Sequence, residues 1–297
     1  MPKFEIRPGF AAAVRTSACR AALRFTTVML AGLVFAPLIA ASATADNPEL
    51  VEFEKMTWVE VQAALAAGRT TALIYTGGVE ERGPQNANGG HNLMAHATVE
   101  AIARRLGNAI FMPVLPFTPN EADPRLPGTI GITNDLLEKL LTRIAEQSIV
   151  NGFRNIILMG DHGGGQPRVY EAVTKTLNAK YGARGVHVYY CDQVYRANEA
   201  FDRYLAARGF PPSIHGGIPD TSLMLFLDKD HTWVRRSLIE SAVGSPIVNG
   251  KPQIDPHGPV NGIIGDARRS DPELGKRLFE MKLEYAVRQI RGFLASR

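Results

Sequence analysis

Cysteine is scarce in this chain: its 297 residues contain only Cys19 and Cys191. Cys19 lies in a segment that we expect to be removed, so the mature protein would keep one cysteine and form no intramolecular disulfide. Cys191 ends the apolar run VHVYYC, which favours a buried structural thiol over a reactive nucleophile. The stability of the mature protein must therefore come from its core.

The chain also lacks an N-terminal apolar run long enough to cross a membrane. The run Phe25–Ala40 contains a proline and is shorter than the about 20 residues of a spanning helix. Five basic residues precede it and small residues follow it, which is the pattern of a secretory signal peptide. We expect residues 1–45 to be removed after Ala43 or Ala45, leaving residues 46–297 in the periplasm or outside the cell. An uncleaved membrane anchor is the alternative.

An excess of charge of one sign is absent from the expected mature chain. Residues 1–45 hold five basic residues and one acidic residue, so 28 basic and 28 acidic residues remain. A formal net charge of zero gives no electrostatic reason to expect a nucleic-acid partner. No stable membrane association is expected after cleavage, and about 250 residues suit one α/β domain.

Apolar runs typical of buried strands alternate with segments of helical periodicity. The strand-like runs are 71–77, 109–117, 154–160 and 186–191, of which 109–117 begins as a strand and runs into a proline-broken loop. The helix-like segments are 91–107, 133–152, 167–181 and 271–294. This alternation predicts an α/β fold with a mainly parallel sheet between two layers of helices, a three-layer αβα sandwich. Functional sites in such folds lie beyond the carboxyl ends of the strands.

Two polar loops follow the first and third of these strand-like runs. Glu80 and His91 lie in GGVEERGPQNANGGHN, and His162 lies in GDHGGGQP, where its glycines permit a sharp turn and a close ligand approach. Together the three would form a two-histidine, one-carboxylate set that suits catalytic zinc and also iron. The alternatives are solvated loops, a tight turn or a phosphate cradle. The last is disfavoured because GxGxxG and a Walker lysine are lacking.

Five blocks of sequence resemble the creatininase family, and they occur in the family's order across nearly all of residues 70–295. They are GGVEERGP for G-x-x-E-x-H-G-P, LPGTIGI for F-P-G-T-I-x-L, NGFRNIILMGDHGGG for G-F-R-x-I-x-x-x-N-G-H-G-G-N, HGGIPDTSLML for H-A-G-x-x-E-T-S-L-M-L, and GIIGDARRSDPELGKRL for the C-terminal G-x-x-G-D-P segment. The resemblance implies the creatininase fold, a binuclear metal site and hydrolysis of cyclic or linear C–N amide bonds in small molecules. It also implies a homo-oligomer, often of six subunits.

The same resemblance assigns roles to individual residues. Glu80 and His162 fall on family metal ligands, and Asp220 falls on the glutamate of the H-A-G-x-x-E block. His215 falls on the family's catalytic proton donor. Asp220 is expected to be a further metal ligand or the general base.

Two departures from the family pattern alter the expected metal site. Arg82 stands where the family has a ligand histidine, and arginine cannot bind a metal. His91 stands where the family has a bridging aspartate, and a neutral imidazole offers one lone pair to one metal. We therefore expect one divalent metal per chain, zinc first and manganese or iron otherwise, held by Glu80, His91 and His162.

Arg82 is expected to supply positive charge in place of the lost metal and to contact a substrate oxyanion or carboxylate. A structural salt bridge to Asp220 or Asp123 is the alternative. The predicted activity is metal-dependent hydrolysis of an amide bond in a small polar molecule. Two rival hypotheses are a hydrolase of ring carbonyl compounds, such as an oxidised sugar or inositol, and a non-catalytic ligand-binding protein.

Overall fold

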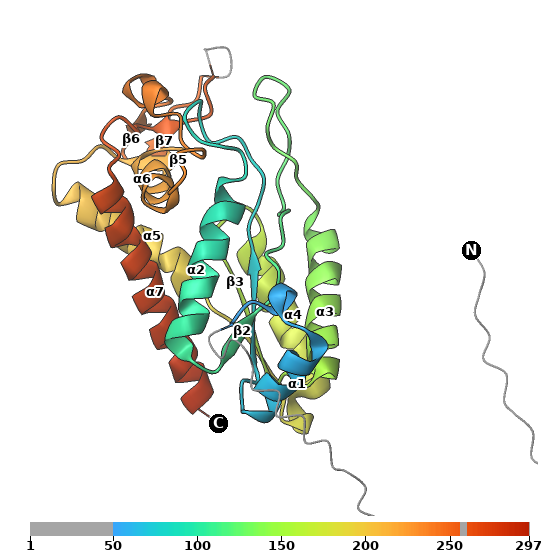
Figure 1. The fold of residues 1–297 in the computed structure, drawn as a ribbon. Helices are drawn as coiled ribbons and strands as arrows, with labels where there is room; N and C mark the ends of the chain where they lie inside the picture. Colours follow the sequence, from blue (N-terminus) through green and yellow to red (C-terminus); the bar gives the residue numbers. More distant parts are fainter. Residues whose placement is uncertain (1–49, 256–259, 297) are drawn as a thin grey trace, which may run out of the picture. The chain divides into compact units, whose positions relative to one another are not determined.

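Four parallel strands form the central sheet, in the order β2-β1-β3-β4 (Figure 1). The strands are β1 (Thr71–Thr76), β2 (Ala109–Phe111), β3 (Asn155–Gly160) and β4 (His187–Tyr190). The structure, a computed structural model, describes residues 50–255 and 260–296. The expected signal peptide, residues 1–45, lies outside the described residues.

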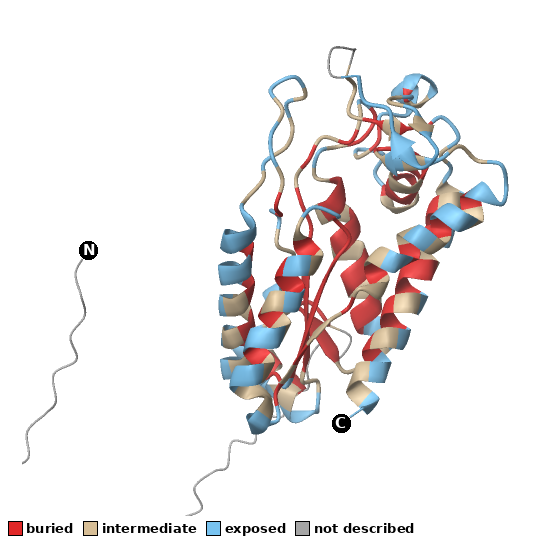
Figure 2. Ribbon diagram, turned by 180° about the vertical axis from the view of Figure 1, so that it is seen from behind, coloured by how far each residue is buried: buried red, intermediate tan, exposed pale blue. Residues whose placement is uncertain are grey.

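Helices cover both faces of this sheet. One face packs against α2 (Gly90–Leu106), α5 (Gln193–Ala206) and α7 (Pro272–Ala295), and the other against α1 (Trp58–Ala66), α3 (Asn134–Asn151) and α4 (Gln166–Tyr181). Successive side chains of a strand point to opposite faces, so Leu73 and Tyr75 join the first layer while Ala72 and Ile74 join the second. Figure 2 shows buried residues on the strands and on the helix sides that face them. The predicted three-layer αβα sandwich is confirmed.

The ends of several helices follow from their sequence. Thr133 caps α3 by accepting a hydrogen bond from the Leu136 N–H, and Gly152 ends the same helix in the left-handed region. Asp271 caps α7 through the Glu273 N–H. The strand expected to begin at Ala109 and run into a proline-broken loop is confirmed, because β2 ends at Phe111 and prolines, which lack the N–H of a ladder, follow it.

A smaller layer lies beyond the carboxyl ends of the strands (Figure 1). It contains α6 (Ile218–Leu227) and an antiparallel pair of β5 (Ser213–His215) with β8 (Ile264–Gly265). The remaining short elements are η1 (Phe53–Lys55), η2 (Gly182–Arg184), η3 (Arg236–Ser241), β6 (Ile247–Val248) and β7 (Lys251–Pro252). Within the described ranges, the structure contains no helix with the length and apolarity needed to span a bilayer.

Candidate active site

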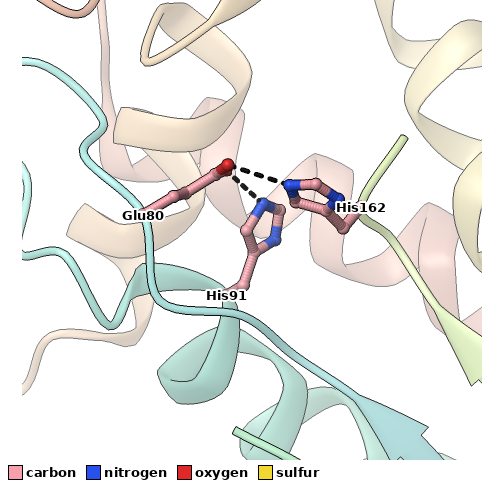
Figure 3. Close-up of side chains that lie close together, drawn as sticks. All are labelled: Glu80, His91 and His162. Carbon is pink, nitrogen blue, oxygen red and sulfur yellow. Dashed lines mark hydrogen bonds and ion pairs between the residues drawn. The ribbon is translucent and has the colours of Figure 1, made fainter. Parts of the chain in front are cut away.

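Glu80, His91 and His162 converge beyond the ends of two neighbouring strands. Glu80 lies in the loop after β1, His91 is the second residue of α2, and His162 follows β3 by two residues. The last residues of the two strands, Thr76 and Gly160, are paired in the sheet, so both loops leave it side by side. Figure 3 shows both imidazole rings directed at the Glu80 carboxylate.

The three side chains form a buried, bonded cluster. The Glu80 Oε1 atom lies 2.8 Å from His91 Nε2, and Oε2 lies 2.9 Å from His162 Nε2. The candidate ligand atoms all lie within 4.8 Å of one another. Although burial disfavours its charge, the hydrogen bonds from the two histidines hold the pKa of Glu80 well below its usual range. Glu80 is therefore a carboxylate at neutral pH.

The far side of the His91 ring contacts a second carboxylate, Asp161. His91 Nδ1 lies 3.0 Å from Asp161 Oδ1, and the other carboxylate oxygen, Oδ2, lies 3.2 Å from Lys282 Nζ. Burial opposes the charge of Asp161, but Lys282 and the His91 hydrogen bond keep the pKa of Asp161 well below its usual range. Burial and the Arg82 charge act against protonation of His91, yet the two carboxylates raise its pKa.

Asp161 and Lys282 are site residues that our sequence reasoning missed. Asp161 directly precedes His162 and stands where the family pattern has glycine, which was a visible departure. Lys282 lies on the buried side of α7, next to the apolar residue Leu283, and is only 1% exposed. A lysine beside the apolar stripe of a helix was the available signal, although its partner lies 121 residues away in the sequence.

His162 is held from two sides. Its Nδ1 atom accepts a hydrogen bond of 3.0 Å from the Gly164 N–H, so a neutral ring carries its proton on Nε2, facing Glu80. Asn120, also missed from the sequence, donates a 2.8 Å hydrogen bond to Glu80 Oε2. A metal ion on His162 Nε2 would displace that proton, and the Gly163–Gly165 turn would have to adjust around Nδ1.

Arg82 forms an ion pair with Asp220 rather than with Asp123, which pairs with Arg125. The Arg82 side chain is 2% exposed, and the charge of Asp220 raises its pKa although burial opposes this. Asp220 also accepts a 2.9 Å hydrogen bond from the Gly216 N–H. In the described part of the chain, Nε and Nη1 of Arg82 have no hydrogen-bond partner. Arg82 thus brings a permanent charge to the site, and its two unpaired donors are themselves buried.

His215 lies at the edge of the cluster. Its Nε2–H donates a 2.7 Å hydrogen bond to the Glu81 carbonyl oxygen, and Nδ1 lies 3.9 Å from Glu80 Oε1. Burial alone would lower the pKa of His215, but the Glu81 side chain, whose Oε1 lies 3.7 Å from Nε2, and the charges of Glu80 and Asp220 together raise that pKa. Because the backbone fixes Nε2 as the donor, Nδ1 is the nitrogen that can give or take a proton toward the cluster.

A cavity of about 480 Å³ opens over these residues. Its floor contains the cluster residues, Arg82, Asp161, His215 and Asp220. One wall is a polar stripe of α5 formed by Tyr195, Asn198, Glu199 and Asp202. Burial, together with the charges of Asp220 and Glu199, raises the pKa of Asp202 to about 6. The cavity is therefore polar and of a size for a small molecule.

The cluster has the donor set of a catalytic metal site. Two imidazoles and one carboxylate leave positions open for water and substrate, as catalytic zinc requires. The hydrogen bond between His91 Nδ1 and Asp161 directs Nε2 toward the centre, which is the usual outer support of a metal-bound histidine. Asp220 is outside this cluster because its carboxylate pairs with Arg82. The residues thus fit one divalent ion.

Comparisons with known proteins agree with this architecture. The family model of creatininase, described as creatinine amidohydrolase, matches residues 54–290. A creatinine amidohydrolase of Pseudomonas putida is 24% identical over 249 residues, which cover 80% of this chain and 95% of that protein. A crystal structure of creatinine amidohydrolase (creatininase) has a TM-score of 0.67 at 23% identity and covers 84% of this chain and 99% of its own.

Two further creatininase structures are similar in fold. One, described as creatininase Mn, has a TM-score of 0.66 at 22% identity and covers 83% of this chain and 99% of its own. The other, a variant of Zn-Zn type, has a TM-score of 0.67 at 22% identity with the same coverage. The family match spans most of the described residues and includes every residue of the candidate site. The chain therefore belongs to the creatininase family.

Proposed function

We propose that this protein is an exported, metal-dependent amidohydrolase that cleaves a cyclic or linear C–N amide bond of a small polar molecule. The observation that carries the proposal is the convergence of Glu80, His91 and His162 at the floor of a polar cavity, with His215 beside them. The P. putida relative is a creatinine amidohydrolase, and related structures are of Zn-Zn and Mn forms. These relatives support divalent-metal chemistry in this chain.

The charges at the site favour one divalent ion. Among the groups that contact the cluster or Arg82, Glu80, Asp161 and Asp220 are carboxylates, and Arg82 and Lys282 are cations, which leaves one net negative charge when the histidines are neutral. The wall residues Glu199 and Asp202 lie outside this count. One divalent ion changes that balance to one positive charge. A second ion would raise it to three in a buried region, where uncompensated charge is costly.

The residues around the cluster have separable roles. A divalent ion bound there would supply Lewis acidity, which polarises a carbonyl group and acidifies water. His215 would deliver a proton from Nδ1 to the leaving nitrogen, since Nε2 is committed to the Glu81 carbonyl oxygen. The charge of Arg82, which lines the cavity, would stabilise negative charge on the substrate. Asp220 would act as a metal ligand or a general base only if its carboxylate left Arg82 and contacted a metal ion or a water molecule instead.

Elemental analysis of the purified mature protein tests the metal. We expect about one equivalent of zinc, manganese or iron per chain, and hydrolysis of members of a panel of cyclic and linear amides. A stoichiometry near two contradicts the single-ion site. A stoichiometry near zero after full loading, with ligand binding but no turnover, favours the non-catalytic binding protein.

The basic, apolar and small-residue pattern of residues 1–45 underlies the proposed export. We expect N-terminal sequencing of the exported protein to begin at Thr44 or Asp46. Exported protein that retains Phe25–Ala40 contradicts cleavage.

We further propose that the protein is a homo-oligomer, with six subunits as the expected number. Light scattering on the mature protein would measure its mass. Exposed apolar side chains available for contacts are Trp58, Ile130, Leu136, Leu140 and Val150.

A further inference from the structure

Lys282 is a buried charge with a defined set of contacts. It comes from the middle of α7, is 1% exposed, and places Nζ 3.2 Å from Asp161 Oδ2 and 3.3 Å from the Val194 carbonyl oxygen. Burying an ammonium group is costly unless it is paired and hydrogen-bonded. A methionine or leucine at this position would fill the same space without that cost. The retained charge therefore points to a task beyond packing.

Asp161 connects this lysine to the candidate metal ligand His91. Its two carboxylate oxygens face different partners, Oδ1 toward His91 Nδ1 and Oδ2 toward Lys282 Nζ. Because Lys282 occupies one oxygen, the orientation of the carboxylate is fixed and the other oxygen accepts the Nδ1–H of His91. The ring is thereby held with Nε2 toward Glu80, 2.8 Å away.

This chain differs from the family pattern at positions 91 and 161, and the two differences are chemically complementary. The family pattern has aspartate and glycine at these positions, whereas this chain has histidine and aspartate. An imidazole that replaces a carboxylate ligand needs an acceptor for its second nitrogen, and the new carboxylate supplies it. A buried carboxylate in turn needs a cation, and Lys282 supplies that.

We propose that Asp161 and Lys282 are a positioning pair, which fixes the ring of His91 so that its Nε2 is preset for one divalent ion. The inference rests on the proposed metal-dependent function. It assigns the pair no contact with substrate. A purely structural ion pair is the competing explanation, so the test needs a measurement that such a role would not change.

The test compares Asp161→Asn, Lys282→Met, Lys282→Arg and the double variant Asp161→Leu with Lys282→Met. The matched control is Lys276→Met, which removes an exposed lysine of the same helix. Zinc affinity is measured by chelator competition, and folding by circular dichroism and melting temperature. The protected Nδ1 proton of His91 is measured by NMR in the metal-free protein.

We expect the two single charge-removing variants to lose about 10- to 100-fold in zinc affinity and to lose the protected Nδ1 proton. Lys282→Arg should retain both, and the control should match the parent protein. The double variant removes both buried charges, so its melting temperature should recover while zinc affinity stays low. Recovery of zinc affinity together with stability would overturn the positioning role.

The NMR measurement keeps the two proposals separate. If the parent protein binds neither zinc, manganese nor iron, the proposed function fails, and a protected His91 Nδ1 proton that disappears in the single variants still supports the positioning pair. If either single variant folds and keeps both that proton and its zinc affinity within twofold, the positioning pair is wrong. Should Asp161→Asn fail to fold, the Lys282 variants decide the question.

Discussion

Removing the charge of Arg82 should destabilise the protein through Asp220. Arg82→Met keeps much of the side-chain volume but leaves the Asp220 carboxylate without its cation. Breaking a buried ion pair by removing one partner typically costs about 3–5 kcal/mol. Asp220 is 22% exposed toward the cavity and keeps its Gly216 hydrogen bond, so we expect about 2–3 kcal/mol here.

A double-mutant cycle isolates this contribution. Asp220→Asn removes the unpaired carboxylate, so the double variant should lose less free energy of unfolding than the two single variants together, by about 2 kcal/mol. Urea denaturation at pH 7, with equal m-values for all four proteins, gives the four free energies. Losses that add within about 0.5 kcal/mol would show that the pair is not coupled, and the reasoning would be refuted.

The variant Arg82→Lys distinguishes a purely structural role of Arg82 from a role in substrate contact. Lysine retains the charge but loses the planar fork that presents several donors at once. If Arg82 contacts substrate, KM should rise or kcat should fall while the melting temperature changes little. A lower melting temperature with unchanged kinetics of the folded fraction would assign Arg82 a structural role alone.

Three further variants test the remaining roles. His215→Ala should lower kcat by about a hundredfold to ten-thousandfold with the metal content unchanged, and loss of metal would make His215 a ligand. His162→Ala should remove most of the metal in elemental analysis, because two remaining ligands hold it weakly. Asp202 has a pKa of about 6 in the folded protein, which is above its value in the unfolded chain. Its ionisation therefore lowers the free energy of unfolding as the pH rises from about 4 to about 6. Asp202→Asn should therefore raise the melting temperature at pH 7.5 but not at pH 4, and an equal gain at both would contradict this.

Local signals predicted the layers of the fold and the four strands of its central sheet. The predicted helix-like segments 133–152 and 271–294 correspond to α3 and α7, whose ends are encoded within a few residues by Thr133, Gly152 and Asp271. The loop expected after the strand that begins at Ala109 was visible from its prolines, but the end of β2 at Phe111 was not, because hydropathy does not show where hydrogen bonding stops. The helices α1, α5 and α6 were not predicted.

The candidate site was predictable only where each residue stood out locally. Glu80 and His162 matched family motifs, and the structure brings them together with His91. Asp161 and Lys282 were missed, because the burial of a charge depends on a partner that is distant in the sequence. A single sequence shows the identity of such residues but not their pairing.

The place of Lys282 in the last helix has a consequence for the assembly of the site during synthesis. The candidate ligands lie between residues 80 and 162, whereas the cation behind His91 is made 120 residues after His162, in α7. A product that stops before α7 would contain every candidate ligand and lack the group that orients one of them. Translation through α7 is thus a condition for a correctly oriented site, and chains truncated before α7 should be poor competitors for scarce metal.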